Sequence, residues 1–186
     1  MRAFKAFNKD MTCNRGRGSF QYRENTTYRE DKAQAHETGF HCAEFILDCF
    51  RYYPAHKDTI VCPVEALGDI DEDGSDTKIS CTVMQIGRRL TVEEIVFEAM
   101  KYIVRHPKYT SKDIESNNAI GRGLYCIVRG KDPRAAGAEG TVLGLIKEKK
   151  RSKEVEAIAV YTVGKGGIRQ GRYYDINGEE VANEEG

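Results

Sequence analysis

The chain has 186 residues, of which 40% are hydrophobic and 31% charged, enough to bury one sizeable core or two small ones. Its 29 Lys and Arg residues balance its 29 Asp and Glu residues, so bulk charge does not favour direct nucleic-acid binding. No apolar run is long enough to cross a bilayer or to act as a secretory signal, so we expect a cytoplasmic protein without membrane association.

Six cysteines are spread along the chain, and several of them fall on apolar stripes. They form no C-x-x-C pair and do not cluster with histidines at zinc-finger spacing. Because reduced, buried thiols are usual in a cytosolic protein, we expect all six to be free. They are Cys13, Cys42, Cys49, Cys62, Cys81 and Cys126.

The first elements in chain order are short. Alternation predicts a strand over residues 1–7, and a polar, glycine-bearing loop then leads to β-prone pieces at residues 20–31. The stretch GFHC at residues 39–42 precedes a pattern that predicts a helix over residues 43–53, ended by Pro54. Its apolar positions recur at three- and four-residue spacing, with Glu44, Asp48 and Arg51 opposite: Cys42, Ile46, Cys49, Phe50 and Tyr53.

Two further elements complete the first part. Residues 59–86 contain two alternating stretches around a turn, which predicts a β-hairpin, with Pro63 at an edge or a bulge. The clearest helix signal covers residues 91–106, where Thr91 and Glu94 fit a capping box.

The second part has a different character. Residues 107–186 are punctuated by glycines and contain short apolar pieces but no long helical period. The sequence therefore predicts an α+β domain over residues 1–106, with a mainly antiparallel sheet and two helices. A small, mostly β module follows over residues 107–186.

Five stretches of the first part occur in a characteristic order: AFKAFNKDMTC, FQYRENTTY, GFHCAEFILDCFRYYP, VCPVEALGDI and TKISCTVMQIGRRLTVEE. Together they resemble a domain of unknown function found in phage and prophage proteins, over residue 1 to roughly residue 95. A later stretch, VRGKDPRAAGAEGTVLGLI, is similar to the last turn and cap of a glycine- and alanine-rich β-solenoid. The resemblance implies a phage setting and a truncated solenoid-like C-terminal part, but no activity.

His41 is the first candidate site residue. It fits a substrate contact at the mouth of a cleft, but a half-buried ring bonded to nearby backbone is the favoured interpretation, because the sequence reveals no partner for it. Lys5 on the first strand, the GFH turn and a helix ending at Tyr53 loosely resemble ADP-ribosyltransferase-like folds, which hold NAD between two small sheets. Such enzymes need a late-strand glutamate, for which Glu65 is the candidate. His41, Tyr53 and Lys5 are thus the catalytic candidates of this alternative.

Arg15 and Arg17 lie in a glycine-bearing loop and are candidates for contacting a phosphate or an acidic partner, with a plain solvated loop as the alternative. Asp69, Asp71 and Asp73 match the first half of a calcium loop, but a simple hairpin turn is favoured because the twelfth position is Ser80.

A metal site drawn from two cysteines and two histidines is not expected, because the cysteines share an apolar helix face with aromatic side chains. The four residues are Cys42, Cys49, His36 and His41. We expect neither a metal nor a cofactor.

The leading functional hypothesis is a phage-encoded, non-enzymatic binding protein that acts on a host component. Counter-defence, such as inhibition of a CRISPR system, would suit that setting, with a host protein or ribonucleoprotein as partner in the host cytoplasm. A homo-oligomer is left open. The alternatives are an ADP-ribosyltransferase-like enzyme that uses NAD and a structural phage component.

Overall fold

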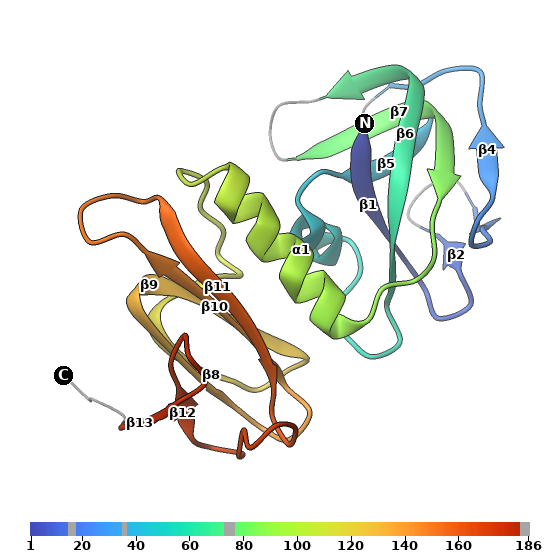
Figure 1. The fold of residues 1–186 in the computed structure, drawn as a ribbon. Coiled ribbons are helices and arrows are strands. Elements are labelled where there is room, and N and C mark those ends of the chain that lie inside the picture. Colours follow the sequence, from blue (N-terminus) through green and yellow to red (C-terminus); the bar gives the residue numbers. More distant parts are fainter. Residues whose placement is uncertain (15–17, 35–36, 73–76, 183–186) are drawn as a thin grey trace. The chain divides into compact units, whose positions relative to one another are not determined.

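The computed structural model of the protein describes residues 1–14, 18–34, 37–72 and 77–182 (Figure 1). The chain divides into two compact units, Met1–Leu90 and Thr91–Gly186, and each is described by itself. The helix predicted over residues 91–106 falls in the second of these units.

The fold is mostly β, so the predicted α+β class is wrong. Strands make up 46% of the chain and helices 12%. The first unit holds a closed barrel of four strands where a mainly flat sheet with packed helices was expected. The physical reason is that a closed sheet buries its inner side chains by itself and needs no helical layer to cover them.

Four antiparallel strands of the first unit form a ring. They are β1 (Arg2–Phe7), β5 (Phe40–Ala43), β6 (Ile60–Glu72) and β7 (Lys78–Ile86). β1 pairs with β6, β6 with β7, β7 with β5, and β5 again with β1. Figure 1 shows these strands wrapped around one another.

Apolar side chains at alternate positions of the four strands fill the barrel. The buried core includes Ala3, Phe7, Cys42, Cys62, Val64, Ala66, Ile79, Cys81, Met84 and Ile86. Three short strands extend this unit, and they are β2 (Thr12–Cys13), β3 (Phe20–Gln21) and β4 (Thr27–Arg29). β2 pairs with β3, while β4 continues along the edge of β7 beyond β5.

The hairpin predicted over residues 59–86 is confirmed by β6 and β7. Pro63 of β6 pairs with Phe4 of β1 and lies just beyond the last β6–β7 pair, Val64 with Ile86. Its missing N–H therefore falls where the ladder to β7 has ended, which explains how a proline fits in this strand.

The helix predicted over residues 43–53 is wrong. Phe40–Ala43 forms β5, and only a short 3₁₀ helix, η1 (Ile46–Arg51), follows. The segment buries consecutive residues rather than one stripe, and Asp48, expected on the outer face, is fully buried. Its carboxylate accepts a hydrogen bond from Thr77 Oγ1 at 2.7 Å and lies 3.0 Å from Arg51 Nε. These two contacts satisfy the buried carboxylate of Asp48, whereas the predicted α-helix would have exposed this side chain to solvent.

The helix predicted over residues 91–106 is confirmed as α1 (Val92–Arg105). Its capping box is also present: Thr91 Oγ1 accepts a hydrogen bond from the Glu94 N–H, and the Glu94 carboxylate accepts one from the Thr91 N–H. The buried face includes Ile95, Val96, Ala99, Met100 and Ile103.

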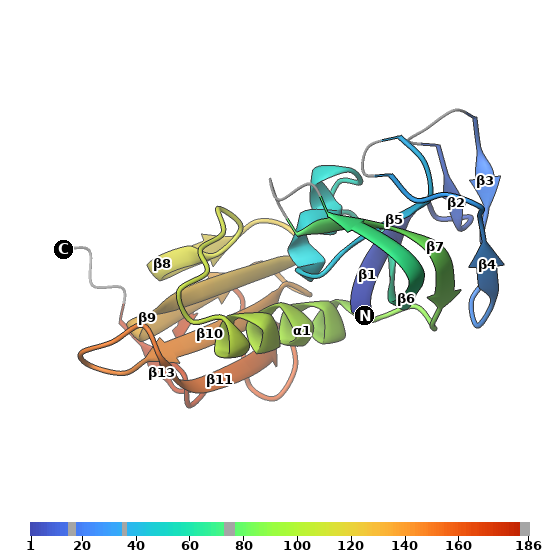
Figure 2. The same ribbon diagram turned by 90° about the horizontal axis from the view of Figure 1, so that it is seen from above.

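The second unit contains a six-stranded sheet. Its strands are β8 (Glu115–Gly121), β9 (Tyr125–Gly137), β10 (Val142–Glu148), β11 (Val155–Thr162), β12 (Tyr173–Tyr174) and β13 (Glu180–Val181). α1 lies along β10 and β11, as Figure 2 shows. Gly144 of β10 makes this approach close, because a Cβ there would lie 2.7 Å from Val96 Cγ1 of the helix.

β8, β9 and β10 pair in parallel, although only residues 138–141 separate β9 from β10. Parallel neighbours normally need a long crossover. Here β9 turns back on itself, so that Tyr125 at its start lies beside Val142 of β10 and Gly137 at its end lies beside Gly121 of β8. Pro133 stands between the two paired parts of β9, where no ladder bond is needed from its nitrogen.

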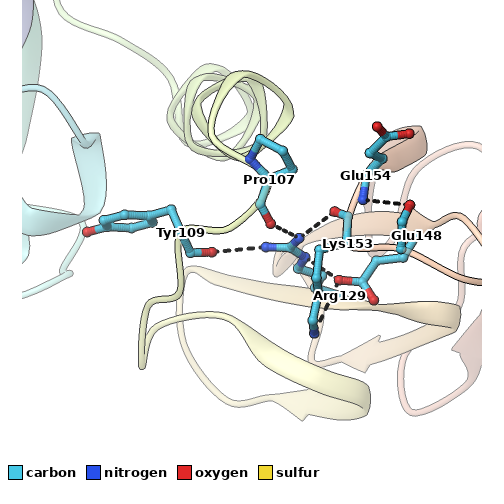
Figure 3. Close-up of polar contacts among 7 residues, drawn as sticks. Pro107, Tyr109, Arg129, Glu148, Lys153 and Glu154 are labelled. Carbon is cyan, nitrogen blue, oxygen red and sulfur yellow. Dashed lines mark hydrogen bonds and ion pairs between the residues drawn. The ribbon is translucent and has the colours of Figure 1, made fainter.

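Arg129 of β9 ties several segments of the second unit together (Figure 3). Its Nε donates to Glu148 at 2.7 Å, and its two terminal nitrogens donate to the carbonyl oxygens of Tyr109, Lys153 and Pro107. The Arg129 and Glu148 side chains are only 10% and 8% exposed. The guanidinium fork thereby joins the segment after α1, β9, β10 and the β10–β11 hairpin.

We predict that Arg129→Met lowers the free energy of unfolding by about 3–5 kcal/mol, because three carbonyl groups lose their donor and the buried Glu148 carboxylate keeps only the more distant Lys153 ammonium, 3.6 Å away. Denaturant unfolding followed by circular dichroism measures this loss. The matched control is Lys149→Met, which breaks an exposed pair with Glu154 and should leave the free energy of unfolding close to that of the wild type. Equal losses in the two variants would contradict the role of Arg129.

Candidate functional site

The barrel wall has one weak seam. β1 pairs with β6 at every position from Arg2 to Phe7, but with β5 only where Phe4 meets Ala43. Beyond that pair the ladder stops, and residues 4–6 of β1 and 41–43 of β5 line a cavity of about 530 Å³. We call this gap the β1–β5 seam.

Side chains replace the missing ladder along the seam. The Cys49 thiol of η1 donates to the Phe4 carbonyl at 3.3 Å, and the Cys13 thiol lies 3.7 Å from the Ala6 carbonyl. On the opposite strand, the carbonyl of His41 accepts a hydrogen bond from Lys5 Nζ at 2.7 Å. The backbone of the seam is thus bonded, yet the two strands are held apart and a cavity is kept open between them.

Lys5 is the most unusual of these groups, because its ammonium lies inside the protein. The residue is only 9% exposed, and Nζ lies 5.3 Å from the centre of the Tyr22 ring and 5.8 Å from that of Phe7. Among the described residues, no carboxylate lies within ion-pair distance of Lys5 Nζ. A buried charge without a counter-ion is costly in free energy, so a lysine kept at a cavity wall points to a role in that cavity.

Two thiols near Lys5, those of Cys42 and Cys49, are held in the neutral form. Burial raises the pKa of Cys49 to about 12, although the nearby Lys5 charge pulls in the opposite direction. The pKa of Cys42 is raised because its thiol donates to Cys81 and because it is buried, whereas the same hydrogen bond lowers the pKa of Cys81. Cys42 and Cys49 therefore add no negative charge next to the ammonium of Lys5.

The structure brings three predicted site residues to this one cavity. Lys5 contributes from β1, His41 from β5, and Tyr53 from the turn after η1. Tyr53 is buried and His41 half-buried. Their catalytic roles stay predictions, because proximity alone does not define a reaction.

Other predicted site residues lie elsewhere. Glu65 is exposed on β6 and does not line the cavity. Asp69 and Asp71 lie near the far end of β6. Four more fall outside the described residues, so their roles stay predictions: Arg15, Arg17, His36 and Asp73. Within the described ranges, no three His, Cys, Asp or Glu side chains are grouped so as to hold a metal ion.

Sequence reasoning missed several cavity residues, among them Lys78 and the aromatic residues Phe20, Tyr22 and Tyr52. Lys78 Nζ lies 5.3 Å from the centre of the Tyr52 ring, and the residue is buried. For Lys5 a further signal existed, because it alternates with the inward-facing Ala3 and Phe7. Lys78 had no such signal, since β7 is buried on both faces at its start.

Gly39 shapes the turn that presents His41 to the cavity. Its φ is +89°, and a Cβ there would lie 2.5 Å from Ser80 Oγ and 3.1 Å from the Cys81 carbonyl oxygen. Ser80 is itself fixed by a 2.6 Å hydrogen bond to the Thr38 carbonyl. The GF pair before the histidine therefore reflects a close backbone approach.

We predict that Gly39→Ala lowers the free energy of unfolding by about 2–4 kcal/mol, the sum of an unfavourable φ and a steric clash. Gly18→Ala is the control, because Gly18 has a φ of +98° but open space around its Cβ position. It should cost only about 1–2 kcal/mol. Denaturant titrations measure the free energy of unfolding of both variants. Equal losses would contradict the predicted steric clash at Gly39.

All six cysteines are free, and five of them are buried. We predict that iodoacetamide at pH 8 alkylates Cys13 first in the native protein, because Cys13 is only half-buried. Cys49, which is buried and has its pKa raised to about 12, should react far more slowly than an ordinary thiol because little of it is thiolate at this pH. Peptide mass spectrometry of timed samples identifies the labelled positions.

The control for the alkylation is the same reaction in denaturant, where all six thiols should be labelled. Fewer than six labelled cysteines in freshly reduced, denatured protein would show a modification, and rapid native labelling of Cys49 would show that the seam opens readily.

The fold and cavity define a class: a mostly β domain, closed into a four-strand barrel, with a ligand-sized cavity in its wall. The chain belongs to the family described as a domain of unknown function (DUF7666), whose model matches residues 1–98. No curated protein and no solved structure matches the chain. The predicted resemblance to a domain of unknown function is confirmed at this level.

In the described part of the chain, no helix has the length and apolar character needed to cross a membrane.

Proposed function

We propose that the barrel unit binds a small organic molecule in the cavity at the β1–β5 seam. One observation supports this most directly: two strands of a closed barrel pair at a single position, and the gap between them is a cavity of about 530 Å³. This volume falls in the range of sites for small molecules, roughly 300–1,000 Å³.

The lining of the cavity agrees with this proposal. Ligand sites usually combine apolar and aromatic walls with a few convergent polar groups. Here aromatic rings and thiols are joined by Lys5, His41 and Tyr53 from three separate segments of the unit. Such a cavity favours a small ligand over a partner that would cover a broad exposed patch.

The functions predicted from the sequence differ in how well they agree with a ligand-binding cavity. An NAD-using transferase gains no support, because Glu65 lies outside the cavity. Action on a host component in a phage setting stays a proposal that rests on the family resemblance, as do counter-defence and a structural role. A solenoid-like second unit also stays a proposal, and the parallel register of β8, β9 and β10 supports it.

The cavity proposal predicts that blocking the cavity abolishes ligand binding without unfolding the barrel. Thr38 is exposed and lines the cavity, so Thr38→Trp should place a large ring over it. Two fluorescent probes of one ring skeleton are suitable, anilinonaphthalene sulfonate and its uncharged parent phenylnaphthylamine. We expect at least one to bind the wild type with a single site, and Thr38→Trp to weaken that binding more than about tenfold.

Thr27→Trp is the matched control, because Thr27 is an exposed threonine on β4 that does not line the cavity. It should bind the probe as the wild type does. Absence of binding by both probes, or equal loss in the two tryptophan variants, would refute the proposed site.

A further inference from the structure

We propose that the ligand of this cavity is a planar, aromatic anion, such as a ring that carries a carboxylate, sulfonate or phosphate group. The inference rests on the proposed function, since it names the class of molecule that the cavity takes. Three features of the lining carry it: a buried ammonium, the layout of charges, and the aromatic rings.

The first feature is Lys5. An ammonium has three N–H donors, and among the described residues one hydrogen bond of Lys5 is found, to the His41 carbonyl. The remaining contacts of Nζ are with the faces of Tyr22 and Phe7. An anion that enters the cavity would supply the missing counter-ion and accept the two other N–H groups, which makes the site selective for negative charge.

The second feature is the order of charges from the inside to the surface. Among the described residues, the lining contains two lysines, Lys5 and Lys78, which are 9% and 7% exposed, respectively. The two glutamates of the lining, Glu30 and Glu37, are both exposed, where water screens them. In the described part of the lining, the buried charged side chains are therefore positive, and the two glutamates lie where the cavity meets solvent. An anion bound near the buried lysines would be kept away from the negative charge of the two exposed glutamates.

The third feature is a set of aromatic rings in the lining, one of which is only partly covered by the others. Phe20 lines the cavity and is still 43% exposed, although its ring lies 4.6 Å from that of the buried Tyr22. Tyr52 and Tyr53 line the cavity as well. An exposed phenyl ring and a buried ammonium in the lining of one cavity offer a planar ligand a face to stack on and a charge to bind.

The experiment compares the two probes already named, because they differ only in the sulfonate. Fluorescence titration should show that anilinonaphthalene sulfonate binds the wild type about ten- to a hundredfold more tightly than phenylnaphthylamine, the effect of one or more charged hydrogen bonds. In Lys5→Met, which removes the charge but keeps an unbranched side chain only one atom shorter, the two affinities should become equal. Lys5→Arg should retain a preference for the sulfonate.

Lys9→Met is the matched control, because Lys9 has an exposed ammonium paired with Asp58 and does not line the cavity. It should leave the preference unchanged. Should Lys5→Met fail to fold, the comparison in the wild type decides the question, and Lys78→Met gives a second variant at the same wall.

The outcomes separate the two proposals. Equal affinity of the wild type for both probes, with binding still blocked in Thr38→Trp, overturns the anionic ligand but leaves the cavity as a binding site. A preference for the sulfonate that persists in folded Lys5→Met overturns the role of Lys5 and with it this inference. Failure of both probes to bind refutes the proposed function itself.

Discussion

The closure of four strands into a ring is the constraint on which the first unit depends. β6 is the strand that makes closure work, because it pairs with β1 along one edge and with β7 along the other. The short β5 completes the ring: all four of its residues pair with β7, but only Ala43 pairs with β1. The shortfall in pairing falls at the β1–β5 seam, and the cavity is its direct result. The candidate site is therefore a consequence of the way in which the barrel closes.

Closure also explains where charge is buried. Lys5 stands at an inward position of β1, between Ala3 and Phe7, which places its stem among core residues and its ammonium at the seam. In an ordinary ladder the His41 carbonyl would bond to a backbone N–H, whereas here it bonds to the lysine. A side chain that takes over a backbone function is fixed in place, and a fixed charge recognises a ligand better than a mobile one.

Much of the local structure could be predicted from the sequence. The helix α1 was predictable because its capping box and its apolar period are both local, and the β6–β7 hairpin because its strands adjoin one turn. The helix expected over residues 43–53 failed because the spacing of its apolar residues fits a helix as well as a short buried connection. Ring closure, the turning back of β9 and the cavity depend on register between distant strands, and no local pattern encodes that register. Lys5, His41 and Tyr53 could be singled out one by one, but their convergence could not.

The thiol hydrogen bonds at the seam have a mechanical consequence. A thiol is a weak donor, so the contacts of Cys49 with Phe4 and of Cys13 with Ala6 hold the β1 edge less firmly than a ladder of N–H groups would. Compliance of the barrel is thus concentrated at one place, while β6 keeps the other side of β1 in register. Of the strand contacts that close the ring, the one between β1 and β5 is therefore the one whose loss would break the fewest backbone pairs.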